Sequence, residues 1–222
     1  MKHITLFILL LLFPFCASAQ MENIRGHVRS EYLSQAIDSD AYKYFKTITS
    51  KGTWKDIDYA DRSRSLWQLE RHLDRLIAMA LVYENSARKR SSDLQKITNG
   101  LRFWFDGHFR NDNWWYQKIG IPCRILNLAY ILDDDIPANL HGPVSEALRV
   151  IDSDDYPARP GGDRSRVLSN HAKALLWQHD SSRVVNIFRK IEAEARIAPI
   201  EEIMSDAAGG MEVRNGWMHA GR

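Results

Sequence analysis

Apolar residues recur at steps of three and four along most of the chain, the spacing that places them on one face of an α-helix. The clearest stripe runs from Asp61 to Tyr83, and we expect Asp61 to cap the start of that helix. Its apolar members are Leu66, Leu69, Leu73, Leu76, Ile77, Ala80 and Leu81. Residues 21–50 show the same period less cleanly, so we expect helix there as well.

Further stripes predict helices over residues 92–105, 119–132, 166–177 and 181–195, and one more helix that Pro143 opens. Pro122 suits the first turn of its helix, because a proline there lacks only an N–H that has no intrahelical partner. No segment of strand length alternates with period two between hairpin signals. Short loops rich in Asp, Pro and Gly separate the stripes, and short loops make neighbouring helices antiparallel. The predicted fold class is therefore all-α, built from antiparallel helix hairpins.

The N-terminus has the layout of a secretory signal peptide. Lys2 and His3 precede an unbroken apolar run from Ile4 to Phe15, and the small residues 17–19 follow it. The run is too short to span a bilayer, so we expect cleavage after Ala19 and a secreted or periplasmic protein. Residues 1–19 are then the leader, and residues 20–222 form one domain.

Charge and motif content exclude several function classes. The chain has 30 Lys and Arg against 28 Asp and Glu, a net charge of +2, which favours neither a nucleic-acid partner nor a membrane surface. The eight histidines show no metal-ligand spacing with each other or with cysteine, so no metal is expected. Dinucleotide and P-loop motifs are absent from the sequence, and no cofactor is expected.

Three consecutive aromatic residues, Trp114, Trp115 and Tyr116, follow Asn113 just before the helix that contains Pro122. Successive side chains on a helix diverge by about 100°, so at most two of the three can face one core. An exposed indole can stack on the apolar C–H face of a sugar ring, and an asparagine amide can both donate and accept hydrogen bonds. The alternative is that both indoles are core residues with satisfied N–H groups.

Residues 113–122 resemble the Asn-Trp-Trp-x-x-(Gln/Glu)-Ile-Gly-(Ile/Val)-Pro signature of polysaccharide lyase family 8, with Lys118 as a variation within it. The family includes chondroitin, hyaluronan and xanthan lyases, and the resemblance covers roughly Trp54 to Arg222. It implies part of an incomplete (α/α) toroid, the N-terminal domain of a larger enzyme. It also implies that Trp114 and Trp115 stack on sugar rings, with Asn113 beside them.

The residue that binds the substrate carboxylate departs from the family pattern. Members of the family usually carry a later Gly-Ala-Asn, and the nearest match here is Gly161-Gly162-Asp163. An aspartate would repel a uronate unless Arg164 or Arg166 neutralises it, and Asn170 is a second candidate for the asparagine. The expected substrate-binding residues are therefore Asn113, Trp114, Trp115, Arg166 and Asn170.

The catalytic histidine and tyrosine of the family lie in a segment resembling Asp-Gly-Ser-Phe-His-Gln-His. Residues 211–222 resemble the approach to that segment, so we expect the catalytic residues beyond Arg222. His219 stands in a sequence context that does not match it. The resemblance thus implies a fragment of an exported lyase that binds a uronic-acid polysaccharide such as chondroitin or hyaluronan for β-elimination. Its further C-terminal domains are the expected partners.

Two other functions remain open on the residues alone. A non-catalytic glycan-binding module would use Trp114 and Trp115 without further chemistry. A glycoside hydrolase on an α/α barrel would need two carboxylates about 5 to 10 Å apart, for which Asp106 and Asp112 can be nominated.

The first prediction concerns activity. The 222-residue chain is expected to show little or no lyase turnover, because proton abstraction and leaving-group protonation each contribute about 10²- to 10⁴-fold. The unsaturated uronate formed by β-elimination absorbs in the ultraviolet, so incubation with chondroitin, hyaluronan and xanthan measures turnover directly. Robust turnover would contradict the expectation and make His219→Ala the next variant to test.

Overall fold

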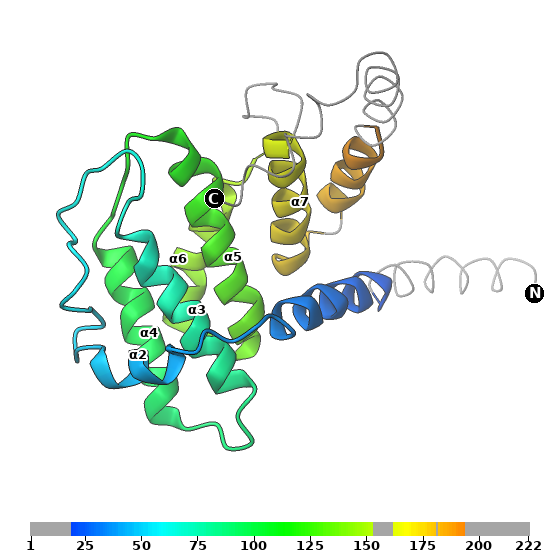
Figure 1. Ribbon diagram of the computed structural model, residues 1–222. Helices are drawn as coiled ribbons and strands as arrows, with labels where there is room; N and C mark the ends of the chain where they lie inside the picture. The colour runs from blue at the N-terminus through cyan, green and yellow to red at the C-terminus, as the bar shows by residue number, and fades with distance from the viewer. Residues whose placement is uncertain (1–18, 153–161, 181, 194–222) are drawn as a thin grey trace, which may run out of the picture. The chain divides into compact units, whose positions relative to one another are not determined.

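The computed structural model describes residues 19–152, 162–180 and 182–193, which contain helices, turns and loops but no β-strand (Figure 1). The all-α prediction is therefore confirmed. These residues belong to two compact units that divide between Val150 and Ile151. The predicted leader before Ala19 and the glycine-rich stretch after residue 206 lie outside the described residues. Within them, no helix is long and apolar enough to cross a membrane.

The first unit contains a helix over residues 19–33, then α2 Ala41–Thr47, α3 Glu70–Glu84, α4 Ser91–Asp106, the π-helical turn η1 Tyr116–Gly120, α5 Ile121–Leu132, the 3-10 turn η2 Asp133–Asp135 and α6 Ala138–Arg149. The second unit contains α7 Gly162–Trp177 and a helical stretch over residues 182–193. Four predicted helices, over 92–105, 119–132, 166–177 and 181–195, match α4, α5, α7 and this last stretch.

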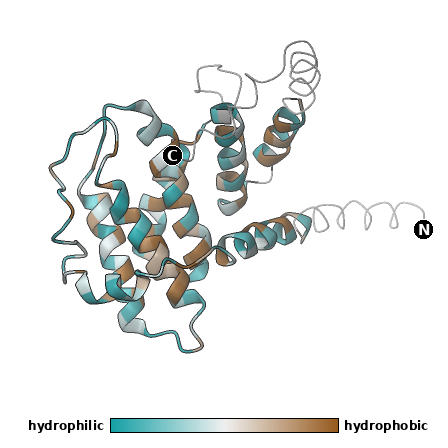
Figure 2. Ribbon diagram, viewed as in Figure 1, coloured by the Kyte–Doolittle hydropathy of each residue, from teal (hydrophilic) through white to brown (hydrophobic). Residues whose placement is uncertain are grey.

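Helix α3 lies at the centre of the first unit, where it contacts α2, α4 and α5, while α5 also contacts α6. Both α3 and α5 carry long apolar stretches, drawn brown in Figure 2. The largest fully buried side chains are Trp54, Trp67, Leu69, Leu73, Leu76, Met79, Ile97, Leu101, Leu126, Leu128, Tyr130 and Ile131. Most come from these two helices and α4, as their predicted stripes required.

The predicted helix from Asp61 to Tyr83 begins nine residues later, at Glu70. The Asp61 side chain accepts hydrogen bonds from the backbone N–H groups of Ser63 and Gln68, both at 2.9 Å. Such local bonds offer the backbone an alternative to helix. Leu66, assigned to the apolar stripe, has a φ of 53° and is 86% exposed. Asp61 thus organises a loop, and the prediction that it caps a helix was wrong.

Pro143 does not open a helix as predicted, because it lies inside α6. The helix begins at Ala138, directly after Pro137, whose carbonyl accepts a hydrogen bond from Leu140 at 2.8 Å. An internal proline removes one N–H bond and crowds the preceding turn. Burial of Leu140, Val144 and Leu148 along one face offsets that cost.

The predicted helix over residues 21–50 is two helices, over residues 19–33 and α2, separated by a turn. The longer one is held by ion pairs to the far ends of α3 and α5. Arg25 and Arg29 bind Asp133, and Arg29 also pairs with Glu84 at 3.0 Å. Burial raises the pKa of the Glu84 carboxyl. These partly buried charges fix the helix to the first unit, because removing either partner would leave the other uncompensated.

His72 is a fully buried histidine of α3 that bonds to two other segments. Its Nε2 lies 3.0 Å from the carbonyl of Gly100 in α4, so this nitrogen carries the proton. Its Nδ1 then accepts a hydrogen bond from the Tyr59 hydroxyl at 3.0 Å, and that hydroxyl accepts one from the backbone N–H of Trp54 at 3.1 Å. Burial lowers the pKa of His72 to about 4, which keeps the ring neutral.

The second prediction follows from that pKa. The folded protein holds His72 neutral, while the same histidine in the unfolded chain binds a proton near pH 6.5. The contribution of His72 to the free energy of unfolding is therefore fully present above pH 6.5 and decreases as the pH falls towards 4. Between pH 7 and pH 5 this group alone should lower the free energy of unfolding by about 2 kcal/mol. Urea denaturation at both pH values measures the change. His72→Phe should remove that dependence, whereas His27→Gln, at an exposed position, should keep it. An unchanged dependence in His72→Phe would contradict the assignment.

Candidate functional site

The candidate site is the aromatic segment between α4 and α5. Trp114 is 44% exposed, Trp115 is half-buried, and Tyr116 is only 6% exposed. The three side chains therefore point in different directions, as their spacing requires. One indole is available to solvent, a second is partly available, and the phenol belongs to the core.

Tyr116 fixes this segment to the start of α3. Its hydroxyl accepts a hydrogen bond from the backbone N–H of Trp67 at 3.2 Å, and the two rings meet edge to face with centroids 5.5 Å apart. Edge-to-face aromatic pairs stabilise beyond the area they bury. Since Tyr116 is held inward, the side chain two residues earlier is turned outward, which explains the exposure of Trp114.

Two asparagines hold the segment against the loop before α3. Asn111 donates its amide to the Ser63 carbonyl at 2.8 Å, and its oxygen accepts the Asn113 N–H at 2.8 Å. The Asn113 amide donates to the Arg64 carbonyl at 2.8 Å and accepts a hydrogen bond from the backbone N–H of Trp115 at 3.0 Å. Asn113 thus positions Trp115. One N–H and one oxygen lone pair of the Asn113 amide are not used in these bonds.

Sequence reasoning missed Asn111. The Asn-x-Asn spacing was the available signal, because asparagine side chains often bond to the backbone two residues further on and so shape turns.

The Trp115 ring lies against Gly120, five residues further along the π-helical turn. A Cβ on Gly120 would come within 2.5 Å of Cζ3 of that indole, so only glycine leaves room for the ring. The ring also meets Tyr116 edge to face, with centroids 5.5 Å apart. Trp115 is thereby fixed by packing on one side, while its remaining surface is accessible.

Polar groups next to the aromatic segment are mostly committed to the protein. Arg124 of α5 pairs with Glu70 at 3.0 Å and Asp74 at 2.7 Å, and it donates to the Gly120 carbonyl at 3.1 Å. Its charge is therefore not available to neutralise a bound carboxylate. The amide nitrogen of Gln117 is buried and has no hydrogen-bond partner among the described residues, a feature that sequence reasoning did not anticipate.

The other predicted ligands belong to the second unit. Arg166 and Asn170 lie one turn apart on α7, so they share a face of that helix. Arg166 is exposed, Asn170 is half-buried, and Arg166 approaches the Asp163 carboxylate at 3.5 Å. Arg166 thus offsets part of the negative charge of Asp163.

Other candidates carry less support. Asp106 and Asp112 are both exposed, while His219 lies outside the described residues. In the part of the chain that the structure describes, no three His, Cys, Asp or Glu side chains are grouped as metal ligands.

These features define an all-helical domain that presents Trp114 and Trp115 on a fixed segment, which we call the tryptophan platform. The chain belongs to polysaccharide lyase family 8: its residues 17–179 match the N terminal alpha-helical domain of that family. The resemblance of residues 113–122 is therefore confirmed at the level of the whole domain, and so is an all-helical fold of the α/α toroid type.

Individual relatives agree with this assignment. Chondroitinase-AC of Pedobacter heparinus is 28% identical over 89 residues, which are 39% of this chain and 13% of that protein. A solved structure of chondroitinase AC lyase from enzyme–oligosaccharide complexes matches 77% of this chain and 26% of that one, with a TM-score of 0.69 and 18% identity. The Paenibacillus xanthan lyase structure matches 80% of this chain and 19% of that one, with a TM-score of 0.57 and 17% identity. The chain thus spans about a quarter or less of these relatives.

The third prediction tests how the segment is held. Asn113→Ala removes the hydrogen bonds to Arg64 and Trp115, so the free energy of unfolding should fall by about 1–2 kcal/mol. Chemical denaturation gives the value. Asp112→Ala, at the exposed neighbouring position, should change it by less than about 0.5 kcal/mol. Equal effects of the two substitutions would show that Asn113 does not position the segment.

Proposed function

We propose that this chain is the N-terminal helical part of an exported polysaccharide lyase, and that it binds a uronic-acid polysaccharide for β-elimination. The leading candidate substrate is a glycosaminoglycan such as chondroitin or hyaluronan. The support is the family assignment together with a chondroitinase among the relatives. Export is proposed from the leader-like residues 1–19.

The observation that carries the proposal is the pair Trp114 and Trp115, one exposed and one half-exposed, on a segment fixed before any ligand arrives. Bonds from Asn113 and packing against Gly120 hold Trp115 in place. A fixed aromatic surface loses little side-chain entropy when a sugar stacks on it, which favours binding. The free N–H of Asn113 can donate to a sugar hydroxyl beside the indoles.

β-Elimination needs more than a platform. A base takes the C5 proton of the uronate, an acid protonates the departing C4 oxygen, and a C4–C5 double bond forms. Neutralising the carboxylate makes the C5 proton more acidic, and we propose Arg166 or Asn170 for this role. Asp163 competes for Arg166 at 3.5 Å, so ligand binding would exchange one carboxylate for another. We propose that the base and acid are a histidine and a tyrosine beyond Arg222, in the C-terminal domains.

The alternatives are less well supported. A glycoside hydrolase is not favoured, because the chain belongs to a lyase family and the two nominated carboxylates, Asp106 and Asp112, are both exposed. A glycan-binding module without catalysis would use the same platform. Lyase turnover measured with the C-terminal domains supplied distinguishes the two functions, whereas turnover of this chain alone does not.

The fourth prediction is that chondroitin or hyaluronan oligosaccharides change the intrinsic tryptophan fluorescence of the chain. Trp114→Ala and Trp115→Ala should each weaken binding by up to about tenfold, since one aromatic contact contributes about 0.5–1.5 kcal/mol. A fluorescence titration measures both constants. Phe188→Ala, which removes a 38% exposed aromatic ring from the second unit, is the matched control and should have no effect.

Two outcomes would contradict the platform. One is a saturating fluorescence change that both tryptophan variants retain with unchanged affinity. The other is the absence of any change with chondroitin, hyaluronan and xanthan oligosaccharides while the chain is folded by circular dichroism.

A further inference from the structure

A groove of about 870 Å³ lies between α2, the end of α3 and the start of α4. We call it the α2–α4 groove. Its lining includes one exposed aromatic residue and five charged residues, Tyr42, Lys46, Arg88, Arg90, Asp93 and Lys96. In Figure 1 the loop that joins α3 to α4 lies at the opposite end of these helices from the segment that joins α4 to α5. The groove is therefore separate from the tryptophan platform, and neither the family signature nor the candidate ligands include its residues.

The α2–α4 groove carries an excess of positive charge. Four cationic side chains line it against the single carboxylate of Asp93. Lys46, Arg88 and Arg90 are exposed, and within the described residues none of the three forms an ion pair. Lys96 donates to the backbone carbonyl of Phe45 at 2.9 Å, which leaves its charge uncompensated. Concentrated like charge in a concave surface attracts counter-ions, and a polyanion satisfies several cations at once.

An aromatic ring borders these charges. Tyr42 is 68% exposed, and Ile37, also in the lining, is 41% exposed. Among the described residues only three Phe, Tyr or Trp side chains are exposed, and Tyr42 is the most exposed of them. A phenol ring beside cations suits a polymer with both apolar C–H faces and regularly spaced acidic groups, which is the chemistry of an acidic polysaccharide.

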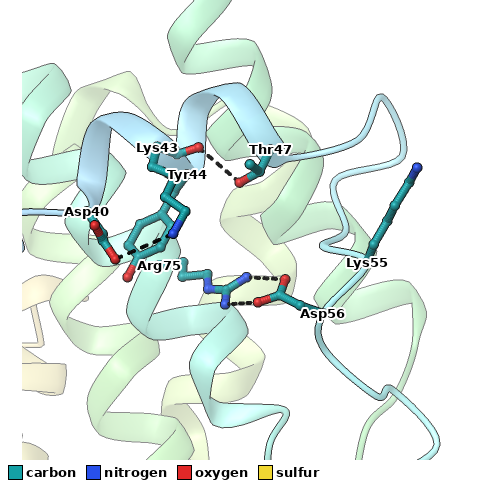
Figure 3. Close-up of a pocket in the computed structure, with 7 residues that line it drawn as sticks. All are labelled: Asp40, Lys43, Tyr44, Thr47, Lys55, Asp56 and Arg75. Atoms are coloured by element: carbon teal, nitrogen blue, oxygen red, sulfur yellow. Dashed lines mark hydrogen bonds and ion pairs between the residues drawn. The ribbon is translucent and has the colours of Figure 1, made fainter.

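The hollow on the other side of α2 provides a contrast (Figure 3). Its volume is about 490 Å³, and its Arg75 donates to both oxygens of Asp56, at 2.8 and 2.5 Å. The same guanidinium lies over the rings of Tyr44 and Trp54, with 5.1 and 5.4 Å to their centroids. Its cation is thus used within the protein. A polyanion would have to displace Asp56 to reach this guanidinium, whereas the cations of the α2–α4 groove need no such exchange.

We propose that the α2–α4 groove is a second binding site, which holds an anionic polysaccharide at the end of α3 away from the tryptophan platform. The choice of ligand class rests on the proposed function. Helix α3 has 15 residues and is therefore about 20 Å long, so short oligosaccharides occupy one site at a time. A long chain engages both sites, and the second contact then occurs at high effective concentration.

The fifth prediction compares two triple variants with equal charge loss. Lys46→Gln, Arg88→Gln and Arg90→Gln together should weaken binding of long chondroitin sulfate about tenfold at low salt, because exposed ion pairs are each weak but additive. The control replaces Lys43, Lys51 and Lys55, exposed lysines outside the groove, with Gln and should retain wild-type affinity. Calorimetric titration gives the constants, and the difference should shrink at 0.5 M salt.

Separate readouts distinguish this site from the tryptophan platform. Short oligosaccharides report on the platform through tryptophan fluorescence, and the groove variant should keep that response. A response that is lost only in Trp114→Ala, with equal chondroitin sulfate affinity for both triple variants, would overturn the groove and leave the proposed function intact. Charge-dependent binding to the groove without any fluorescence response would support the groove and contradict the tryptophan platform.

Tyr42→Ala tests the chemistry of the ligand. It should weaken chondroitin sulfate binding several-fold and leave binding of single-stranded DNA of similar charge unchanged. Equal binding of DNA and polysaccharide, with no effect of Tyr42→Ala on either, would show a non-selective cationic surface and overturn the proposal. Circular dichroism spectra that match the wild type establish that each variant is folded.

Discussion

The buried contact between Tyr116 and Trp67 determines how the aromatic segment is presented. One hydrogen bond and one edge-to-face ring contact attach Tyr116, the residue after the two tryptophans, to Trp67, which lies shortly before α3. With Tyr116 inside, geometry leaves Trp114 outside and Trp115 at the side. The same contact joins the start of α5 to the start of α3, so the platform and the core of the first unit are built from the same interactions.

Helix α3 links the different parts of this unit. The loop before it holds Asn111 and Asn113, its first turn places His72 between Tyr59 of that loop and α4, and its last turn contributes to the cationic groove. A helix packed on three sides transmits little distortion, because interiors at crystal-like density resist small displacements. The platform and the groove are therefore held at a fixed separation along one rigid element.

The parts of the fold that could be predicted from sequence are those where burial alone decides. Helices α4 and α5 were predicted to within a few residues, since their apolar stripes are long and regular. The start of α3 was not, because the apolar spacing continues through Leu66 while the Asp61 side chain captures the backbone in another conformation. The prediction that Pro143 opens a helix was wrong for a related reason, because burial of one face of α6 outweighed the local preference of proline for a helix start.

The candidate site divides in the same way. The exposure of the aromatic run followed from helix geometry, and the family from ten consecutive residues. The engagement of Asn113 with Arg64 needed the fold, because the two residues are 49 positions apart. The α2–α4 groove gathers cations from α2, the loop between α3 and α4, and α4 itself, and no local sequence window contains them together.

The π-helical turn Tyr116–Gly120 gives the platform an unusual capacity for change. A π turn holds one residue more than an α turn, so losing one residue there would restore an ordinary helix and keep α5 in register. The residues before the turn would then rotate by about 100° around the helix axis relative to the core. A single codon deletion can thus re-aim both indoles while every buried residue of α5 keeps its place. Length changes at this turn thus offer a way to redirect Trp114 and Trp115 that substitutions within the packed core do not offer.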